Sequence, residues 1–327
     1  MRYIFKNTWI NSIFVIFILL LILILFFQVH SRLSPLSNIN SINIIRRGLL
    51  LAVPQKYEQI AYENIKKIQT EFHFECPIEV WECGGQEISS SMREKIASLP
   101  NIIFRNVDEY MSVEEAKQKW RGFQVKAFII QHTNFNEFIL CDADCTFYQS
   151  PELLWLDPGY QQTGTYFFRD LKCWQYSPSQ INLPGGDSDA RDRYLKRRKW
   201  LQSIIPKKHQ NLIPFEWKHM RHDQTQQTNN NIITKKNILD VSVAEAYMES
   251  GVVALRTHDP SMKQAIKTIF DLNENHTVTY KHVHGDKETF WIACCIVGVP
   301  FTINEIYPEM KPRLTQYYNN EIFYIQK

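Results

Sequence analysis

Short apolar runs alternate with helix-like segments through most of the chain. Runs of strand length occupy residues 48–54, 77–83, 101–107, 137–142, 164–168 and 249–257. Between them, residues 57–68 carry apolar side chains at helical spacing, and residues 122–133, 261–272 and 285–296 are predicted as further helices. Strands that alternate with helices predict an α/β domain with a mostly parallel, doubly wound sheet.

The middle of the chain interrupts this pattern. Residues 177–190 and 222–231 are polar and rich in turn-forming residues. Between them, residues 191–206 form a basic helix candidate. Its charges fit either a solvated helix face or a surface for an anionic or membrane-proximal partner.

The amino-terminal segment has a different pattern. Residues 9–29 contain no charge, and their only polar side chains are Asn11, Ser12 and Gln28. About 20 apolar residues are long enough to cross a bilayer, whereas a secretory signal has a shorter core and a small-residue cleavage site. We therefore expect cytoplasmic residues 1–8, a transmembrane signal anchor at 9–29, a stem at 30–47 and a lumenal domain at 48–327.

The length and charge of the chain fit this organisation. A chain of 327 residues can form one large α/β domain. Its formal net charge is +3, but residues 1–50 hold five basic residues and no acidic one, so the remainder has 32 basic and 34 acidic residues. A body this close to neutral argues against nucleic acid as a partner, because such binding relies on a broad basic surface.

Candidate chemistry appears where the strand at 137–142 ends. After the apolar run 138–141, Asp142 and Asp144 follow one residue apart. Ligands bind at the carboxyl ends of strands in such sheets, and residues two apart in an extended chain face the same side. Paired carboxylates repel unless a cation lies between them, and a hard divalent cation is suited to oxygen ligands. The alternative is that Asp144 only caps the turn before Ser150 and Pro151.

Five collinear segments resemble one known family. They are "CPIEVWECGGQEIS" (76–89), "GFQVKAFIIQHTNFNEFILCDADCTFYQSPELLW" (122–155), "YQQTGTYFFRD" (160–170), "ESGVVALR" (249–256) and "GDKETFWIA" (285–293). Together they resemble the fungal Mnn1/Mnn2-type α-mannosyltransferases, Golgi type II membrane proteins with a GT-A fold. Residues 171–240 have no matching segment.

The resemblance implies the ligands and several roles. It implies a nucleotide-sugar donor, GDP-mannose, a Mn²⁺ (or Mg²⁺) cofactor, a glycan acceptor and retention at the anomeric carbon. By the same resemblance, Asp144 binds the metal directly, and Asp142 contacts the ribose or reaches the metal through water. Lys126 then contacts the donor; its alternative is an ordinary surface lysine on an amphipathic helix.

Further candidates come from the last two matching segments. Asp286 is expected to cap the helix at 285–296 and, with Lys287, to line the donor pocket. His284 is a candidate metal ligand, with His282 as its competitor. Glu249 is a candidate catalytic carboxylate that binds the acceptor hydroxyl or stabilises charge at the anomeric carbon. The alternatives are ordinary capping for Asp286 and a strand-edge glutamate for Glu249.

The seven cysteines fit no zinc pattern. In an oxidising lumen Cys76 and Cys83 are a candidate disulfide, whereas Cys141, Cys294 and Cys295 lie in apolar runs and are expected to be buried thiols. Asn275 begins a single glycosylation sequon, which is consistent with a lumenal body.

Two alternative functions stay open. One is the same chemistry with a UDP-sugar donor, which would use the same fold and the same aspartates. The other is a non-catalytic lumenal glycan-binding protein, against which the intact Asp142, Asp144 and Glu249 argue.

Overall fold

The computed structural model describes residues 46–171, 196–214 and 247–327. Within these residues, none of the helices is both long and apolar enough to span a membrane. The predicted anchor at 9–29 and the polar segments at 177–190 and 222–231 lie outside the described residues.

A six-stranded sheet forms the centre of the described domain, with the order β3-β2-β1-β4-β7-β6. Its strands are β1 (Arg47–Ala52), β2 (Ile78–Glu82), β3 (Ile102–Asn106), β4 (Glu137–Asp142), β6 (Thr165–Arg169) and β7 (Met248–Arg256). Each predicted strand is therefore present, with bounds within two residues of those expected. The sheet places the carboxyl end of β4 beside the amino-terminal end of β7, because Cys141 pairs with Val252.

The sheet is mostly parallel, as predicted, and β7 is the exception. Strands β1 to β4 run parallel, but β7 is antiparallel to both β4 and β6. The sheet is therefore mixed, with one antiparallel strand among the six. The apolar pattern of residues 249–257 does not indicate the direction of the strand, since a strand buried on both faces is a continuous apolar run in either direction.

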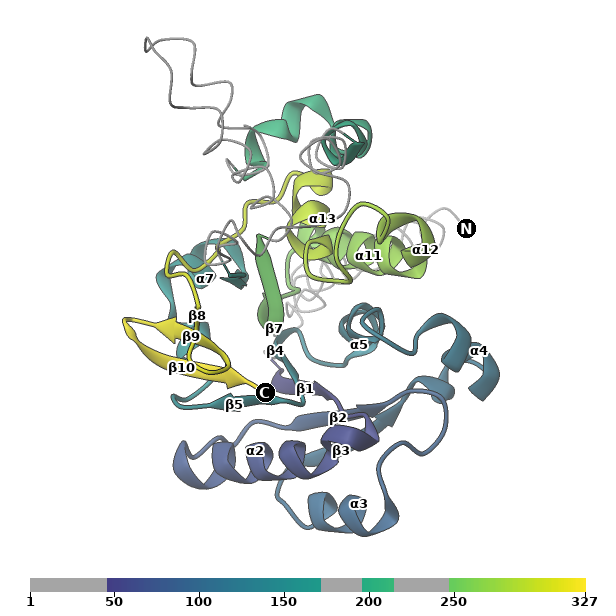
Figure 1. Ribbon diagram of the computed structural model, residues 1–327, viewed down its shortest axis with the longest axis vertical. Helices are drawn as coiled ribbons and strands as arrows, with labels where there is room; N and C mark the ends of the chain where they lie inside the picture. Colours follow the sequence, from purple (N-terminus) through teal and green to yellow (C-terminus); the bar gives the residue numbers. More distant parts are fainter. Residues whose placement is uncertain (1–45, 172–195, 215–246) are drawn as a thin grey trace, which may run out of the picture. The chain divides into compact units, whose positions relative to one another are not determined.

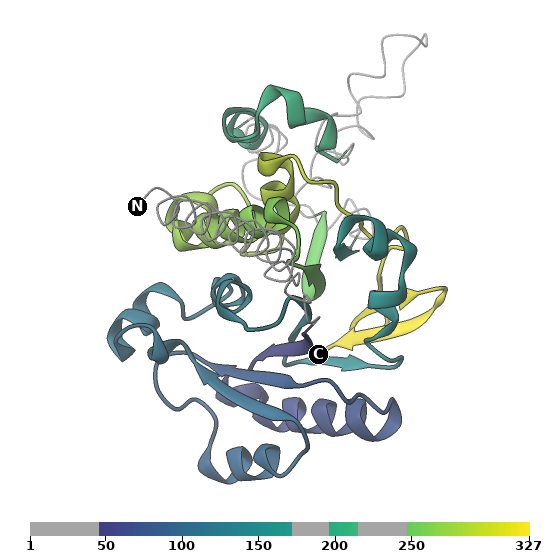
Figure 2. The same cartoon turned by 180° about the vertical axis from the view of Figure 1, so that it is seen from behind.

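Helices cover both faces of this sheet (Figures 1 and 2). One face carries α2 (Glu58–Glu71), α3 (Ser90–Ala97), α6 (Leu153–Leu156) and α7 (Pro158–Thr163). The other carries α4 (Val113–Lys119), α5 (Val125–His132), α11 (Pro260–Glu274), α13 (Thr289–Val297) and a helix at residues 196–204. Shorter elements are α12 (His276–Thr279) and the 3₁₀ helices η2 (Gln55–Tyr57), η3 (Val107–Glu109) and η6 (Lys207–Leu212).

The alternation of side chains along β4 explains the two layers. Phe138 and Leu140 join the core under α5, α11 and α13, whereas Ile139 and Cys141 join the core under α2 and α3. Successive strand residues point to opposite faces, so each apolar residue of β4 is buried against one helical layer. The predicted doubly wound arrangement is confirmed in this respect.

A second, antiparallel sheet was not predicted. It has the order β5-β10-β9-β8 and is formed by β5 (Cys145–Phe147), β8 (Glu309–Met310), β9 (Leu314–Tyr318) and β10 (Glu321–Gln326). Phe147, Phe323 and Tyr324 bury its inner face in the core that also contains α2.

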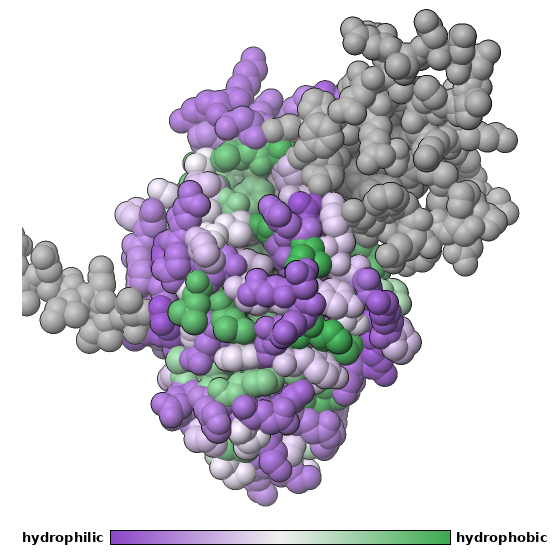
Figure 3. Space-filling model, turned by 90° about the vertical axis from the view of Figure 1, so that its left-hand side faces the viewer, coloured by the Kyte–Doolittle hydropathy of each residue, from purple (hydrophilic) through white to green (hydrophobic). Residues whose placement is uncertain are grey.

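On the side of the molecule seen in Figure 3, hydrophobic residues form small separate areas between hydrophilic ones.

Two helix boundaries differ from those predicted. The expected helix at 122–133 is α5, which begins at Val125. The helix expected at 285–296 begins only at Thr289, since residues 285–288 form turns and Gly285 has a φ of +62°. Its N-cap residue is Glu288, so the expectation that Asp286 caps this helix is wrong. The turn instead leaves the Asp286 side chain free to contact another element.

Candidate functional site

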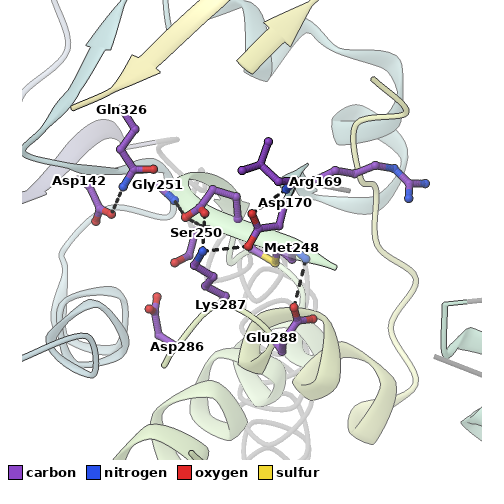
Figure 4. Close-up of polar contacts among 12 residues, drawn as sticks. Asp142, Arg169, Asp170, Met248, Ser250, Gly251, Asp286, Lys287, Glu288 and Gln326 are labelled. Carbon is purple, nitrogen blue, oxygen red and sulfur yellow. Dashed lines mark hydrogen bonds and ion pairs between the residues drawn. The ribbon is translucent and has the colours of Figure 1, made fainter. Parts of the chain in front are cut away.

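Polar side chains converge where β4 ends and β7 begins (Figure 4). Lys126, in the first turn of α5, is 5% exposed. Its ammonium nitrogen lies 3.0 Å from Asp142 Oδ1 and 3.3 Å from Asp286 Oδ2. It also donates hydrogen bonds to the carbonyl oxygen and hydroxyl of Ser250, at 3.0 and 2.8 Å. One buried cation therefore ties α5, β4, β7 and the turn before α13 together.

The surroundings of the Asp142 carboxyl group disfavour its charged form. Burial raises its pKa to about 7, and the nearby carboxylates of Asp286 and Asp144 add to the rise, while Lys126 opposes it. In turn, burial disfavours the charge on Lys126, but Asp142, Asp286 and Glu249 outweigh burial and raise its pKa. Lys126 thus stays charged, and one ammonium group is shared among several carboxylates.

Asp144 lies in the turn between β4 and β5 and is 8% exposed. Burial raises the pKa of its carboxyl group as well, whereas hydrogen bonds, including one from Gln326, lower it. Its backbone carbonyl accepts a hydrogen bond from the Lys327 amide at 3.0 Å. The tight turn keeps the two aspartates close enough for Asp144 to raise the pKa of Asp142.

A second lysine organises the neighbouring part of the site. Lys287 donates to Glu249 Oε2 at 2.6 Å and to Asp170 Oδ2 at 2.9 Å. Asp170 directly follows β6, and Glu249 is the second residue of β7. Burial disfavours charge on Lys287, but these two carboxylates dominate and raise its pKa. The strand ends of β6 and β7 are thereby joined to the turn before α13.

Both oxygens of the buried Glu249 carboxylate are occupied. Oε2 accepts from Lys287, and Oε1 accepts from the backbone amides of Ser250 and Gly251 at 2.9 and 3.2 Å. Burial raises its pKa, an effect that Lys287 opposes. In this arrangement Glu249 fixes the position of Lys287 and of the backbone at the start of β7.

Two further carboxylates flank Lys287 in sequence. Asp286 is 1% exposed, and its Oδ2 atom has no hydrogen-bond partner although Lys126 lies within ion-pair distance. Glu288 is fully buried and accepts hydrogen bonds from the backbone amides of Tyr247 and Met248, at 2.6 and 3.3 Å, and from the Trp291 indole. Burial raises the Glu288 pKa to about 7, while these donors lower it.

The two candidate histidines, His282 and His284, pack against aromatic rings. His284 is exposed, and its ring centroid is 6.4 Å from that of Phe123. His282 stacks on Trp200 at 4.6 Å. In the described part of the chain, no group of three or more His, Cys, Asp and Glu residues has the arrangement of a metal site. The role of His284 as a ligand stays a prediction.

The residue types present nevertheless suit a hard cation. Six carboxylates lie in this region, and the two lysines offset only part of their charge. Asp286 also keeps a buried oxygen without a hydrogen bond. Carboxylate oxygens are what Mn²⁺ and Mg²⁺ prefer, so Asp142 and Asp144 fit such an ion by their chemistry.

Several site residues were missed at the sequence level. Asp170 ends one of the matching segments and follows an apolar strand, which is the signal that singled out Asp142. Ser250 lies in the "ESG" segment beside Glu249. Gln326 comes from β10, for which no strand was predicted, and its amide lies 3.4 Å from Asp142 Oδ2. Local sequence carries no sign that the end of the chain returns to this site.

The cysteine predictions have mixed outcomes. Cys141, Cys294 and Cys295 are buried free thiols, as expected. Cys76 and Cys83 are also free: the first contacts Glu152, and the second donates to the Ala116 carbonyl. The two cysteines flank β2 at opposite ends, and an extended strand of five residues holds them too far apart for a disulfide.

Comparison with known proteins places this geometry in a family. Residues 46–326 match the family model described as "Mannosyltransferase putative". A relative named "Putative alpha-1,3-mannosyltransferase MNN12", from Candida albicans, is 31% identical over 182 residues, which cover 56% of this chain and 18% of that protein. "Alpha-1,3-mannosyltransferase MNN1" of Saccharomyces cerevisiae is 21% identical over 291 residues, covering 82% and 35%. The chain thus matches less than half the length of either relative.

Solved structures give weaker likenesses. The mannosyltransferase Ktr4p from S. cerevisiae has a TM-score of 0.43 at 11% identity and covers 84% of this chain and 71% of its own. Core-mannan synthase A (CmsA/Ktr4) from Aspergillus fumigatus, solved in a Mn/GDP form, has 0.44 at 8%, covering 86% and 77%. The mixed α/β fold follows from the strands and helices of the chain itself. The family model, in contrast, spans residues 46–326 and confirms the resemblance to the Mnn1/Mnn2-type proteins, so the chain belongs to this mannosyltransferase family.

Proposed function

We propose that this chain is a glycosyltransferase of the GT-A type that transfers mannose from GDP-mannose to a glycan acceptor, with retention and with Mn²⁺ or Mg²⁺ as cofactor. One observation carries the proposal. At the carboxyl end of β4, the carboxylates of Asp142 and Asp286 lie within ion-pair distance of the Lys126 ammonium, and Asp144 lies near Asp142. Family membership supplies the sugar and the class of reaction.

The excess of negative charge has a direct consequence for the donor. A nucleotide diphosphate is itself anionic, so it would be repelled from this cluster unless a cation bound with it. Asp142 and Asp144 would hold that cation, whose charge stabilises the leaving diphosphate. His284 is retained as a candidate additional ligand.

The two lysines would then act differently. Lys126 is engaged by Asp142, Asp286 and Ser250, so it holds the walls of the site at fixed positions. Lys287 is held by Asp170 and Glu249, and its side chain is 24% exposed. A positioned and partly exposed ammonium can contact an anionic donor or its leaving group. Glu249 would act chiefly by fixing Lys287 and the start of β7.

We further propose that the chain is a single-pass type II protein of the Golgi or endoplasmic-reticulum membrane, anchored by residues 9–29 with its body in the lumen. The apolar, uncharged sequence of that segment supports this. Asn275 of the sequon is exposed at the end of α11. A mobility shift on deglycosylation, lost in Asn275→Gln, is expected for a lumenal body. A protein without this glycan that is also degraded by protease added outside sealed vesicles would contradict it.

A donor panel tests the proposed reaction. The full chain, purified in detergent, is incubated with GDP- and UDP-sugars and a mannan-type acceptor, with Mn²⁺ or with EDTA. Mannose transfer from GDP-mannose, dependent on Mn²⁺ and abolished in Asp144→Ala, is expected. Turnover of a UDP-sugar instead would correct the donor. Glycan binding without turnover of any donor would favour the non-catalytic glycan-binding alternative.

A further inference from the structure

The carboxyl-terminal strand β10 ends beside the aspartate pair. It pairs with β5 in the small sheet, and Gln326 lies opposite Cys145, the residue that follows Asp144. The ladder continues one residue further, because the Lys327 amide donates to the Asp144 carbonyl at 3.0 Å. The backbone therefore fixes where the Gln326 side chain begins relative to both aspartates.

The Gln326 amide group faces the two carboxylates. Its Nε2 lies 3.4 Å from Asp142 Oδ2 (Figure 4). The Gln326 amide also lies close enough to the Asp144 carboxyl group to lower its pKa. Its Oε1 atom lies against Gly251, where an added Cβ would come within 3.0 Å of it. The glycine leaves room for the amide to pack on β7 with its nitrogen toward the aspartates.

A primary amide is chemically suited to this position. It has two N–H hydrogens, enough for one hydrogen bond to each carboxylate. Because it is neutral, it reduces the cost of holding two carboxylates together without cancelling their charge. A lysine at the same place would neutralise the pair and compete with a cation.

We propose that Gln326 is a positioning residue that holds the Asp142 and Asp144 side chains together as one binding unit. The part of this inference that concerns a cation rests on the proposed function. The part that concerns the two carboxylates stands on the hydrogen bond to Asp142 and on the pairing that places Gln326 beside Asp144.

The first test needs no metal. Denaturant midpoints of the full chain are measured in EDTA at pH 8 for Gln326→Leu, in the wild-type background and in Asp142→Ala/Asp144→Ala. The midpoint shift caused by Gln326→Leu should fall to less than half in the double variant. In that background the Gln326 amide has no carboxylate to bind, so its removal costs less. An equal shift in the two backgrounds would overturn the proposal.

A second variant covers the case in which the double variant does not fold. Gln326→Glu keeps the size of the side chain but replaces two donors by a third negative charge. Without metal it should lower the midpoint more than Gln326→Leu does. An equal or smaller shift would show that the amide hydrogens do not hold the aspartates, and would overturn the proposal.

The third test uses Mn²⁺ alone, titrated into the full chain and followed by the electron paramagnetic resonance signal of the free ion. Gln326→Leu should weaken Mn²⁺ binding about 10-fold or more, the usual effect of losing a residue that orients metal ligands. The matched control is Gln149→Leu, which loses two amide hydrogen bonds to the Tyr318 and Ile322 carbonyls of the same small sheet. It should keep wild-type affinity.

The outcomes separate the two proposals. Unchanged Mn²⁺ affinity in Gln326→Leu, with binding lost in Asp144→Ala, would overturn the positioning role and keep the metal site. If the wild-type chain bound no Mn²⁺, the cofactor in the proposed function would be wrong, and the denaturant tests would still decide whether Gln326 holds the carboxylate pair.

Discussion

Two lysine-centred clusters lie next to each other at one end of the strands β4, β7 and β6. They differ in how many partners the lysine has and in how deeply it is buried. Lys126 donates to Asp142 and to both oxygens of Ser250, and it has Asp286 as a further ion-pair partner; its side chain is 7% exposed. Among the described residues, Lys287 donates to Asp170 and Glu249, with 24% exposure. An ammonium group has three N–H donors, so Lys126 is saturated and Lys287 is not.

The difference separates holding the site together from contacting a ligand. Lys126 joins α5, β4, β7 and the turn before α13, so its loss would affect the whole site. Lys287 is oriented by two carboxylates, is partly exposed, and has a donor that no group in the described part of the chain accepts. The same residue type therefore serves mainly to hold the fold in one cluster and mainly to meet a ligand in the other.

The largest expected effect is on stability at Lys126. Lys126→Met leaves buried carboxylates without their cation, and breaking such a pair costs about 3–5 kcal/mol. Urea unfolding at pH 7.5 measures the loss. Lys267→Met removes a surface pair with Asp271 at 2.8 Å and serves as the control, with an expected change below about 0.5 kcal/mol. Similar small losses in both variants would remove the distinction between the clusters.

Lys287→Met should affect activity more than stability. Lys287 itself is more exposed than Lys126, so we expect a stability loss of about 1.5–3 kcal/mol, the range for hydrogen bonds to charged groups. We expect a fall in kcat/KM for mannose transfer of about 100-fold, as for loss of one group that stabilises transition-state charge. Full activity in this variant would show that Lys287 only supports the fold.

Glu288 sharpens the comparison, because its buried carboxylate is held by N–H donors instead of a lysine. Burial raises its folded-state pKa from 4.5 to about 7. The folded state then binds this proton more tightly than the unfolded state, so this group makes the free energy of unfolding fall as pH rises from about 4.5 to 7. Glu288→Gln should remove that contribution, which is at most about 3 kcal/mol for a shift of this size.

Urea unfolding of wild type and Glu288→Gln at several pH values measures this effect. The wild-type curve should fall more steeply across this range than that of the variant. Parallel curves would mean that Glu288 ionises normally in the folded protein.

The smallest expected effect concerns the segment of β7 that connects the clusters. Glu249 accepts a hydrogen bond from Lys287, and the next residue, Ser250, accepts one from Lys126. Gly251 follows them. An alanine Cβ at 251 would lie 3.0 Å from Gln326 Oε1, 3.1 Å from Cys145 Sγ and 3.3 Å from Tyr324 Oη. Gly251→Ala should cost about 1–3 kcal/mol by overpacking. Thermal unfolding checks this, and an unchanged midpoint would show that the small sheet moves aside freely.

The sequence was most informative where one strand carried both the pattern and the chemistry. The apolar run before Asp142 predicted β4 and its position at a site. Glu249 and Lys287 were singled out from separate segments, and the structure joins them by a hydrogen bond of 2.6 Å. Neither spacing nor composition shows such a contact, because it depends on how β7 and the turn before α13 pack.

What escaped prediction depends on long-range pairing. The direction of β7 is set by its neighbours, and β10 pairs with β5 although Gln326 comes 181 positions after its partner Cys145. Gln326 reaches the aspartates only through that pairing. The capping role expected for Asp286 was wrong because four turn residues, 285–288, precede the helix, and a periodic apolar pattern does not fix where a helix begins.

The most direct test of the central claim is the affinity of the full chain for GDP, measured by calorimetry with Mn²⁺ and with EDTA. If the carboxylates at the end of β4 form the donor site, GDP should bind at least about 10-fold more tightly with Mn²⁺, and Asp144→Asn should abolish that gain. Equal affinity in the two conditions, unchanged by Asp144→Asn, would contradict the assignment of this cluster as the metal and donor site.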